Sequence, residues 1–264
     1  MLSGCRLKNA FDKGQTSMGL WQCLPGANIS RILARTPGVD WVMVDCEHGN
    51  MDGEDRPAPE LPSRDARSGT SYRGMRGALD AGAHGVLVPL LRSAEDAKKV
   101  VAAAKFPPHG QRGFGSPFAM ERFSPIPSMT EYLQHANESL LTMVQIETQE
   151  ALDAVDDIAQ VPGVDVLLIG PFDLGNNIGH PILDGAIGPE LRQAMDRILA
   201  ATKKAGKKAG FFATTPEQAR EYAEKGFDMI SVALDVTHLQ ASLARSLSVA
   251  KGSSAPKTGG GYGA

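Results

Sequence analysis

Short apolar runs recur along the chain, and each is bounded by glycine or proline. Nearly every residue within a run is apolar, rather than every second one, which is typical of parallel strands covered on both faces. The sequence therefore predicts seven such strands: Met18–Leu24, Trp41–Asp45, Gly85–Leu90, Leu141–Glu147, Val164–Ile169, Ala209–Ala213 and Met229–Leu234.

Helical patterns fill the intervals between these runs. The clearest predict helices over Ala94–Ala104, Thr148–Ala159, Pro189–Ala205 and Pro216–Lys225. Ser93 is the expected N-cap of the first of these helices, with Asp96 three residues on as its capping-box partner.

A short repeat marks the places where a helix ends and a strand begins. Glycine, one further residue and then Asp or His precede a strand at four places, which begin at Gly38, Gly82, Gly163 and Gly226. Glycine in such a position ends a helix with a positive φ. Seven β-α units favour a (β/α)8 TIM barrel over a doubly wound sheet, and no G-x-G-x-x-G motif follows any strand.

Two segments break the pattern. Met51–Arg73 is rich in proline and charge where the third strand of a barrel belongs, so this region, about residues 51–73, is predicted to be aberrant or disordered. Residues 251–264 read as a flexible Gly/Ser-rich tail. The expected organisation is therefore one α/β barrel domain over residues 1–250, followed by that tail.

Composition excludes several classes of protein. The formal net charge is −3 and the chain has only two Trp and four Tyr, so no basic, aromatic-rich surface for nucleic acid is expected. No apolar run reaches the ~18 residues of a membrane span. Three cysteines do not form a disulfide framework, and the first residues lack the apolar stretch of a secretory signal. A cytoplasmic enzyme is expected.

Polar side chains follow the strands at the end of the barrel where chemistry collects. Glu147 and Asp173 come at the ends of neighbouring strands, so their carboxylates can converge. A divalent cation would relieve the repulsion between them, and Mg²⁺ or Mn²⁺ suits two carboxylates with open positions for substrate. The alternative is that each carboxylate caps the helix that follows it.

His48 lies three residues after Asp45, at the end of the second strand. A nearby carboxylate can fix the tautomer of a histidine and raise its proton affinity, which indicates a general base. An imidazole satisfied by a loop carbonyl is the alternative. Arg112 lies in a later loop and is a further candidate.

The segments VDCEHG, VQIETQEALDAVDDI and PGVDVLLIGPFDLGNNIGHP resemble the HpcH/HpaI aldolase/citrate lyase family, over roughly Met18 to Leu247. The best match is to its class II pyruvate aldolases, the group of 4-hydroxy-2-oxoheptanedioate aldolase. The resemblance implies a (β/α)8 barrel that forms a homo-oligomer, commonly a hexamer, often with a C-terminal helix exchanged between subunits.

The resemblance also assigns roles. Glu147 and Asp173 match the metal ligands, and His48 with Asp45 matches a catalytic dyad. Three further residues match the 2-oxo acid site: Gln145, and the backbone at Gly170 and Phe172, where Phe172 replaces a smaller residue.

The implied reaction is metal-dependent cleavage of a 4-hydroxy-2-oxo acid to pyruvate, or a related 2-oxo acid, and an aldehyde. A divalent cation, Mg²⁺ or Mn²⁺ with Co²⁺ or Zn²⁺ as further options, would polarise the keto group while His48 takes the proton of the C4 hydroxyl. The alternatives are an acyl-CoA ester lyase of the same superfamily and a catalytically impaired barrel that serves as a subunit or binder.

The family also places an arginine on the third strand, where it stabilises developing negative charge. Counting back from ALDAG puts this arginine near Ala66–Arg67, and counting forward from His48 puts it at Arg73. Arg73 is the catalytic candidate. A displaced arginine would lower the rate by about 10²–10³.

Overall fold

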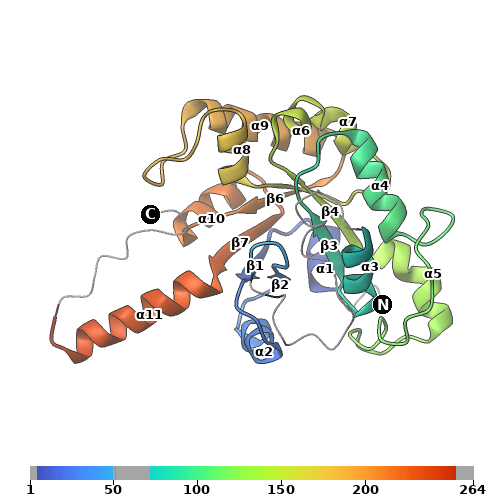
Figure 1. The fold of residues 1–264 in the computed structure, drawn as a ribbon, viewed down its shortest axis with the longest axis horizontal. Helices are drawn as coiled ribbons and strands as arrows, with labels where there is room; N and C mark the ends of the chain where they lie inside the picture. The colour runs from blue at the N-terminus through green and yellow to red at the C-terminus, as the bar shows by residue number, and fades with distance from the viewer. Residues whose placement is uncertain (1–4, 50, 52–71, 254–264) are drawn as a thin grey trace.

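A computed structural model describes residues 5–49, 51 and 72–253 of the protein (Figure 1). Its centre is a sheet of seven strands, in the order β2-β1-β7-β6-β5-β4-β3, and every neighbouring pair is parallel. The strands are β1 (Ser17–Gln22), β2 (Trp41–Val44), β3 (Gly85–Val88), β4 (Leu141–Ile146), β5 (Val166–Ile169), β6 (Lys208–Phe212) and β7 (Met229–Leu234). All seven predicted strands are confirmed, and this α/β sheet agrees with a barrel-like fold.

Helices connect the strands. They are α1 (Arg6–Asp12), α2 (Ala27–Arg35), α3 (Tyr72–Asp80), α4 (Ala94–Ala104), α5 (Met129–Ser139), α6 (Gln149–Asp153), α7 (Val155–Gln160), α8 (Pro171–Asn177), α9 (Pro189–Lys204), α10 (Pro216–Glu224) and α11 (Asp235–Ala250). The predicted helix over Thr148–Ala159 is divided at Ala154 into α6 and α7. Ser93 is the N-cap of α4 and accepts the N–H of Asp96, as predicted.

Two of the expectations concern parts of the chain outside the described residues. The aberrant region at about 51–73 falls mostly on residues 52–71, and only Met51 and the start of α3 belong to the described part. Of the predicted tail at 251–264, only the first three residues belong to the described part. The described sheet therefore has β2 and β3 as its outer strands.

Two apolar clusters hold the sheet in place. The larger one lies between the outer face of the sheet and the helices, and includes Val144, Ile146 and Ile198. The smaller one fills the inner face, where Trp41, Met143 and Leu168 meet the buried side of α1. Burying both faces explains why the strands are apolar at consecutive positions.

The predicted helix-stopping glycines all have a positive φ, between 85° at Gly38 and 97° at Gly226. The acid that follows such a glycine by two positions bonds to the neighbouring strand. Asp40 accepts the N–H of Met18, and Asp165 accepts that of Thr142. Asp228 likewise accepts the N–H of Ala209. This end of the sheet is therefore fastened by carboxylates.

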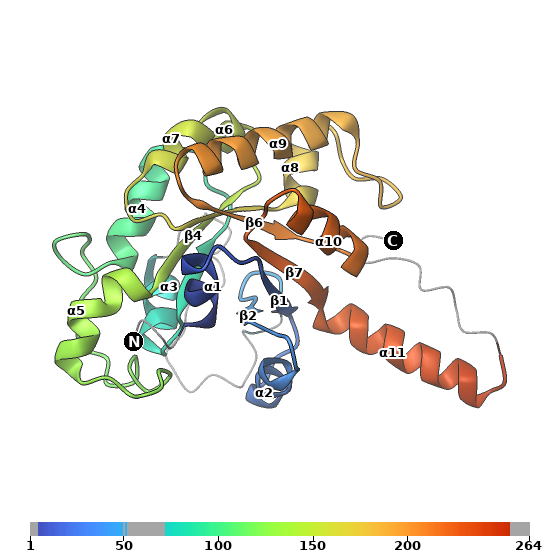
Figure 2. The ribbon, with the colours of Figure 1, turned by 180° about the vertical axis from the view of Figure 1, so that it is seen from behind.

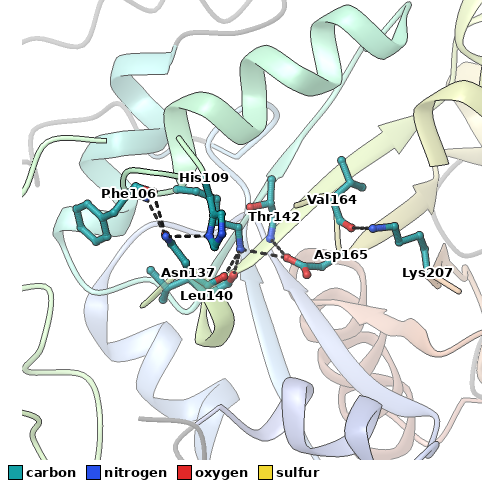
Figure 3. A network of polar contacts seen from close by, with 9 residues as sticks. Phe106, His109, Asn137, Leu140, Thr142, Val164, Asp165 and Lys207 are labelled. Carbon is teal, nitrogen blue, oxygen red and sulfur yellow. Dashed lines mark hydrogen bonds and ion pairs between the residues drawn. The ribbon is translucent and has the colours of Figure 1, made fainter. Parts of the chain in front are cut away.

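A buried lysine joins this end of the sheet to α5. The Nζ of Lys105 donates to the carbonyls of Asn137 and Leu140 at 2.8 and 2.6 Å, and lies 3.4 Å from Asp165 Oδ2. Figure 3 shows the surrounding contacts, including the bond from Lys207 to the carbonyl of Val164. Lys105 is only 4% exposed, so its ammonium group is part of the interior.

The last described helix, α11, departs from this compact arrangement. It extends away from the sheet in both views (Figures 1 and 2), and none of its 16 residues is buried. Its large apolar side chains Leu239, Leu243 and Leu247 are each at least half exposed. No helix of the described part is long and apolar enough to cross a membrane.

Candidate metal and substrate site

A cavity opens at the carboxyl ends of the strands. Its described lining comes from six strands and the turns that follow them: Trp21, Cys23, Asp45, His48, Gln145, Leu168, Gly170, Pro171, Phe172, Asp173, Phe212 and Leu234. Six of the residues predicted for the site are among them. Asp45, His48, Gln145 and Asp173 therefore lie around one cavity, as expected from their places at strand ends.

Glu147 lies directly beside this cavity and is only 2% exposed. Its Oε1 accepts the backbone N–H of Leu90 at 2.8 Å, and its Oε2 accepts Nε2 of Gln145 at 2.5 Å. Burial raises the pKa of Glu147 to about 7, and the charges of Asp173 and Glu47 add to the increase against the two hydrogen bonds. A nearby cation would stabilise the charged form of this carboxylate.

The backbone at Leu90 is shaped to meet this carboxylate. Leu90 has a φ of 55°, in the left-handed region that a leucine rarely adopts. The conformation turns its N–H toward Glu147, while the next carbonyl, that of Leu91, accepts the hydroxyl of Thr148 at 2.7 Å. Backbone strain of this kind persists where the surroundings enforce it, often at functional sites.

Neither predicted ligand acts as a helix cap. Thr148 is the N-cap of α6, and its hydroxyl accepts the N–H of Ala151. Gly170 is the N-cap of α8 and Asp173 lies within the first turn, where no side-chain cap bond is formed. The capping alternative for Glu147 and Asp173 is therefore wrong.

Gly170 allows the closest approach to these groups. A Cβ at this position would overlap Oε2 of Glu147 and Nε2 of Gln145, so no other residue fits without displacing them. The backbone at the start of α8 thus lies directly against the carboxylate and amide.

The Asp45 carboxylate forms hydrogen bonds with the loop that follows it and with a neighbouring strand. Its Oδ1 accepts the backbone N–H groups of Glu47 and His48 at 2.9 and 2.8 Å, and its Oδ2 accepts the indole N–H of Trp21 at 2.7 Å. The His48 ring lies 3.7 Å from Glu47 Oε2, and its side chain is 61% exposed. The carboxylate nearest to the imidazole in the described contacts is thus that of Glu47, whereas the dyad prediction gave this position to Asp45.

Glu47 is the site residue that sequence reasoning missed. Burial raises its pKa, and the charges of Asp45 and Asp173 raise it further against that of His48. Three carboxylates, those of Glu47, Glu147 and Asp173, therefore influence one another. Its place between Asp45 and His48 was the available signal, because all three follow one strand end.

The arginine candidates are placed differently. Arg73 is the second residue of α3, and its side chain lies outside the described part of the structure. Arg112 is buried, donates to Asp80 at 2.7 Å and stacks over the ring of Phe106. Because Asp80 ends α3, just before β3 begins, Arg112 belongs to the opposite end of the sheet from Glu147.

The donor set fits a hard divalent cation. Among residues 5–49, 51 and 72–253 there is no group of three or more His, Cys, Asp or Glu side chains placed to enclose a metal. Two carboxylates with remaining positions open to water and substrate oxygens are what Mg²⁺ or Mn²⁺ requires. Glu147 and Asp173 supply such a pair.

Comparison with known proteins agrees with this geometry. The sequence model of the HpcH/HpaI aldolase/citrate lyase family matches residues 65–242. The chain belongs to this family. It is 32% identical to 2-keto-3-deoxy-L-rhamnonate aldolase of Escherichia coli (strain K12), over 97% of both chains.

Solved structures of the family share the fold. A family protein from Burkholderia cenocepacia J2315 is 30% identical, with a TM-score of 0.78 over 95% of this chain and 100% of that one. The HpcH/HpaI aldolase from Desulfitobacterium hafniense DCB-2 is 27% identical, with a TM-score of 0.76 over 93% and 96% of the two chains. Family membership supports an enzyme of the lyase type.

Proposed function

We propose that this protein cleaves 4-hydroxy-2-oxo acids to pyruvate, or a related 2-oxo acid, and an aldehyde, with a divalent metal as cofactor. The observation that carries the proposal is the buried Glu147 carboxylate, held by Leu90 and Gln145 within the influence of Asp173. Membership of a family of aldolases and lyases supports the same reaction.

Glu147 and Asp173 would hold the cation. When bound, a divalent cation supplies Lewis-acid polarisation of the keto group and offsets the charge that develops on cleavage. The Leu90 N–H and the Gln145 amide fix the orientation of Glu147, so this ligand needs no rearrangement to bind. The backbone at Gly170 and Phe172 is the proposed place for the substrate carboxylate.

His48 is the proposed general base for the C4 hydroxyl. Its exposed ring can reach a substrate in the cavity mouth, and Oε2 of Glu47 lies 3.7 Å from it. Asp45 contributes indirectly, since its bonds to the backbone N–H groups of Glu47 and His48 set the shape of the loop.

We also propose that the protein is a homo-oligomer in which α11 packs on another copy. A groove of about 590 Å³ lies beside α10 and the outer face of β1 and β7, with apolar lining from Met18, Ala219, Ala223 and Val232. The exposed leucines of α11 repeat every four residues and so form one stripe that needs such a surface.

The function is tested by release of pyruvate from a 4-hydroxy-2-oxo acid, followed with lactate dehydrogenase and NADH. We expect activity that depends on Mn²⁺ or Mg²⁺ and falls at least about 100-fold in Glu147→Gln. Glu150→Gln is the matched control, because Glu150 is exposed and lies outside the cavity lining.

Equal rates for Glu147→Gln and the unaltered protein would contradict the metal assignment. Cleavage of a CoA thioester without release of pyruvate would favour the acyl-CoA ester lyase. Calorimetry with pyruvate and Mn²⁺ identifies the third alternative, since an impaired barrel would bind neither.

A further inference from the structure

The turn between β3 and α4 is bonded to the end of β4 at two consecutive positions. The backbone N–H of Leu90 donates to Oε1 of Glu147 at 2.8 Å, and the carbonyl of Leu91 accepts the hydroxyl of Thr148 at 2.7 Å. Glu147, Thr148 and Leu91 are all buried. Hydrogen bonds in such an interior are stronger than in water, so these two bonds hold the strand ends together beside the cavity.

The backbone of Leu90 adopts a conformation that a leucine does not prefer. Its φ is 55°, in the left-handed region where the Cβ comes close to the following carbonyl oxygen. Such a conformation persists only where the surroundings enforce it. Leu91, the next residue, is held by its buried side chain in the larger apolar cluster and by the bond to Thr148. With Leu91 fixed, a change of φ at Leu90 would rotate the Leu90 N–H away from Glu147.

Thr148 forms one hydrogen bond more than a helix cap requires. As the N-cap of α6, its hydroxyl oxygen accepts the N–H of Ala151 at 3.0 Å. Its hydroxyl proton is donated to Leu91, and the residue is only 3% exposed. Thr215, the N-cap of α10, accepts the N–H of Gln218 at 3.1 Å, but within the described part of the chain its hydroxyl donates to no other residue. The two threonines therefore differ in the bond to a strand-end turn.

Glu147 is the proposed metal ligand that these contacts reach. A metal-binding carboxylate is oriented by the hydrogen bonds to its oxygens, and loss of such a partner typically weakens metal binding about 10–100-fold. The Leu90 N–H is one partner of Glu147, and the Gln145 amide is another. If the Leu90 N–H turned away, one carboxylate oxygen would lose its bond in a buried site.

We propose that Thr148 is a positioning residue of the metal site: its hydroxyl holds the carbonyl of Leu91, and this contact keeps Leu90 in the left-handed conformation from which its N–H fixes Glu147. The inference rests on the proposed function. It adds a residue that acts on the metal ligand through the backbone of another strand.

The test measures the affinity for Mn²⁺ by calorimetry. Thr148→Val has nearly the shape of threonine without the hydroxyl, and it should bind Mn²⁺ at least about tenfold more weakly than the unaltered protein. Thr148→Ser keeps the hydroxyl and should stay within about threefold. Thr215→Val is the matched control, because it loses a helix cap of the same kind and should leave the affinity unchanged. Equal losses in Thr148→Val and Thr215→Val would overturn the inference, because helix capping would then explain both.

Leu90→Gly tests the route through the backbone. Glycine adopts a positive φ readily, so Leu90→Gly in the Thr148→Val background should restore at least about threefold of the lost affinity. A role of Thr148 in the stability of α6 alone would give no such recovery, and its absence would overturn the inference. If Thr148→Val does not fold, Leu90→Val replaces it, since a β-branched residue resists this φ, and an affinity equal to that of the unaltered protein would then overturn the inference.

These outcomes are distinct from failure of the proposed function. An unaltered protein that binds no Mn²⁺, or a Glu147→Gln variant that binds it as tightly, would overturn the metal assignment and with it this inference. Unchanged affinity in Thr148→Val, together with a large loss in Glu147→Gln, would overturn the positioning role alone.

Discussion

Asp45→Asn separates two roles that this carboxylate could play. In the structure its oxygens accept three N–H groups, from Trp21, Glu47 and His48, at 2.7–2.9 Å. An asparagine can present its single oxygen to the loop, but its amide N–H₂ then faces the indole N–H of Trp21. One charge-assisted hydrogen bond is lost and one buried donor is left unpaired.

The cost follows from these contacts. A hydrogen bond to a charged group contributes about 1.5–3 kcal/mol, and an unpaired buried donor costs about 1–3 kcal/mol. Asp45 is only 9% exposed, so solvent offsets little of this loss. We expect the free energy of unfolding to fall by about 3 kcal/mol. For a chain of this size the melting temperature should then fall by about 6 °C or more.

The assay is thermal unfolding by calorimetry, together with pyruvate release at 25 °C. Trp21→Phe removes the donor from the other side, so the double variant should lose less stability than the sum of the single variants. Glu47→Gln is the control, since its described contact is a 3.7 Å approach to an exposed imidazole and should affect stability little. Loss of pyruvate release in Asp45→Asn with an unchanged melting temperature would refute this reasoning and restore Asp45 as the partner of the His48 ring.

Three further predictions follow from buried charge and from α11. Burial raises the pKa of Glu147 from 4.5 to about 7, so without metal its contribution to stability is present below pH 4.5 and lost as the pH rises through 7. The affinity for Mn²⁺ measured by calorimetry should rise up to about pH 7 and then level. An affinity that does not change with pH would contradict this. Lys105→Met should lower the free energy of unfolding, measured with urea, by about 3 kcal/mol, because three oxygens lose their contact with the ammonium group. Lys207→Met, which removes one such contact, should lower it by only about 1 kcal/mol, and equal losses would contradict this prediction. Leu243→Glu should reduce the particle mass in light scattering, whereas Ala241→Glu, on the opposite face of α11, should not; an unaltered mass in Leu243→Glu argues against exchange of the helix.

The strands were accessible from sequence, to within two residues at each end, because burial on both faces leaves a continuous apolar run. The glycines at 38, 82, 163 and 226 were equally readable, since each has the positive φ that ends a helix. The break at Ala154 was not, because neither glycine nor proline marks it. The exposure of α11 has no signal in the apolar pattern, because its leucine stripe has the same pattern as a helix packed on its own sheet. Only the family resemblance implied a C-terminal helix exchanged between subunits.

The site could be predicted as a set of residues but not as a set of contacts. Glu147, Asp173 and Gln145 meet because parallel strands end at one edge, and strand order follows from the repeat. The partner of the His48 ring could not be predicted, because it depends on the conformation of the turn over residues 45–48. In that turn the Asp45 carboxylate accepts the backbone N–H groups of Glu47 and His48. The Leu90 N–H was out of reach, because a positive φ at leucine has no sequence signal.

The carboxylates that bond neighbouring strands at their N-terminal ends also have a consequence for how the sequence of the cavity can vary. Asp40, Asp165 and Asp228 each fix a strand to its neighbour at the end of the sheet opposite the cavity. The register of the strands is thus set where no substrate binds. We therefore expect that residues at the cavity wall, such as Phe212, can be replaced with that register kept. A new substrate range can therefore evolve, or be engineered, one wall residue at a time on an unchanged scaffold.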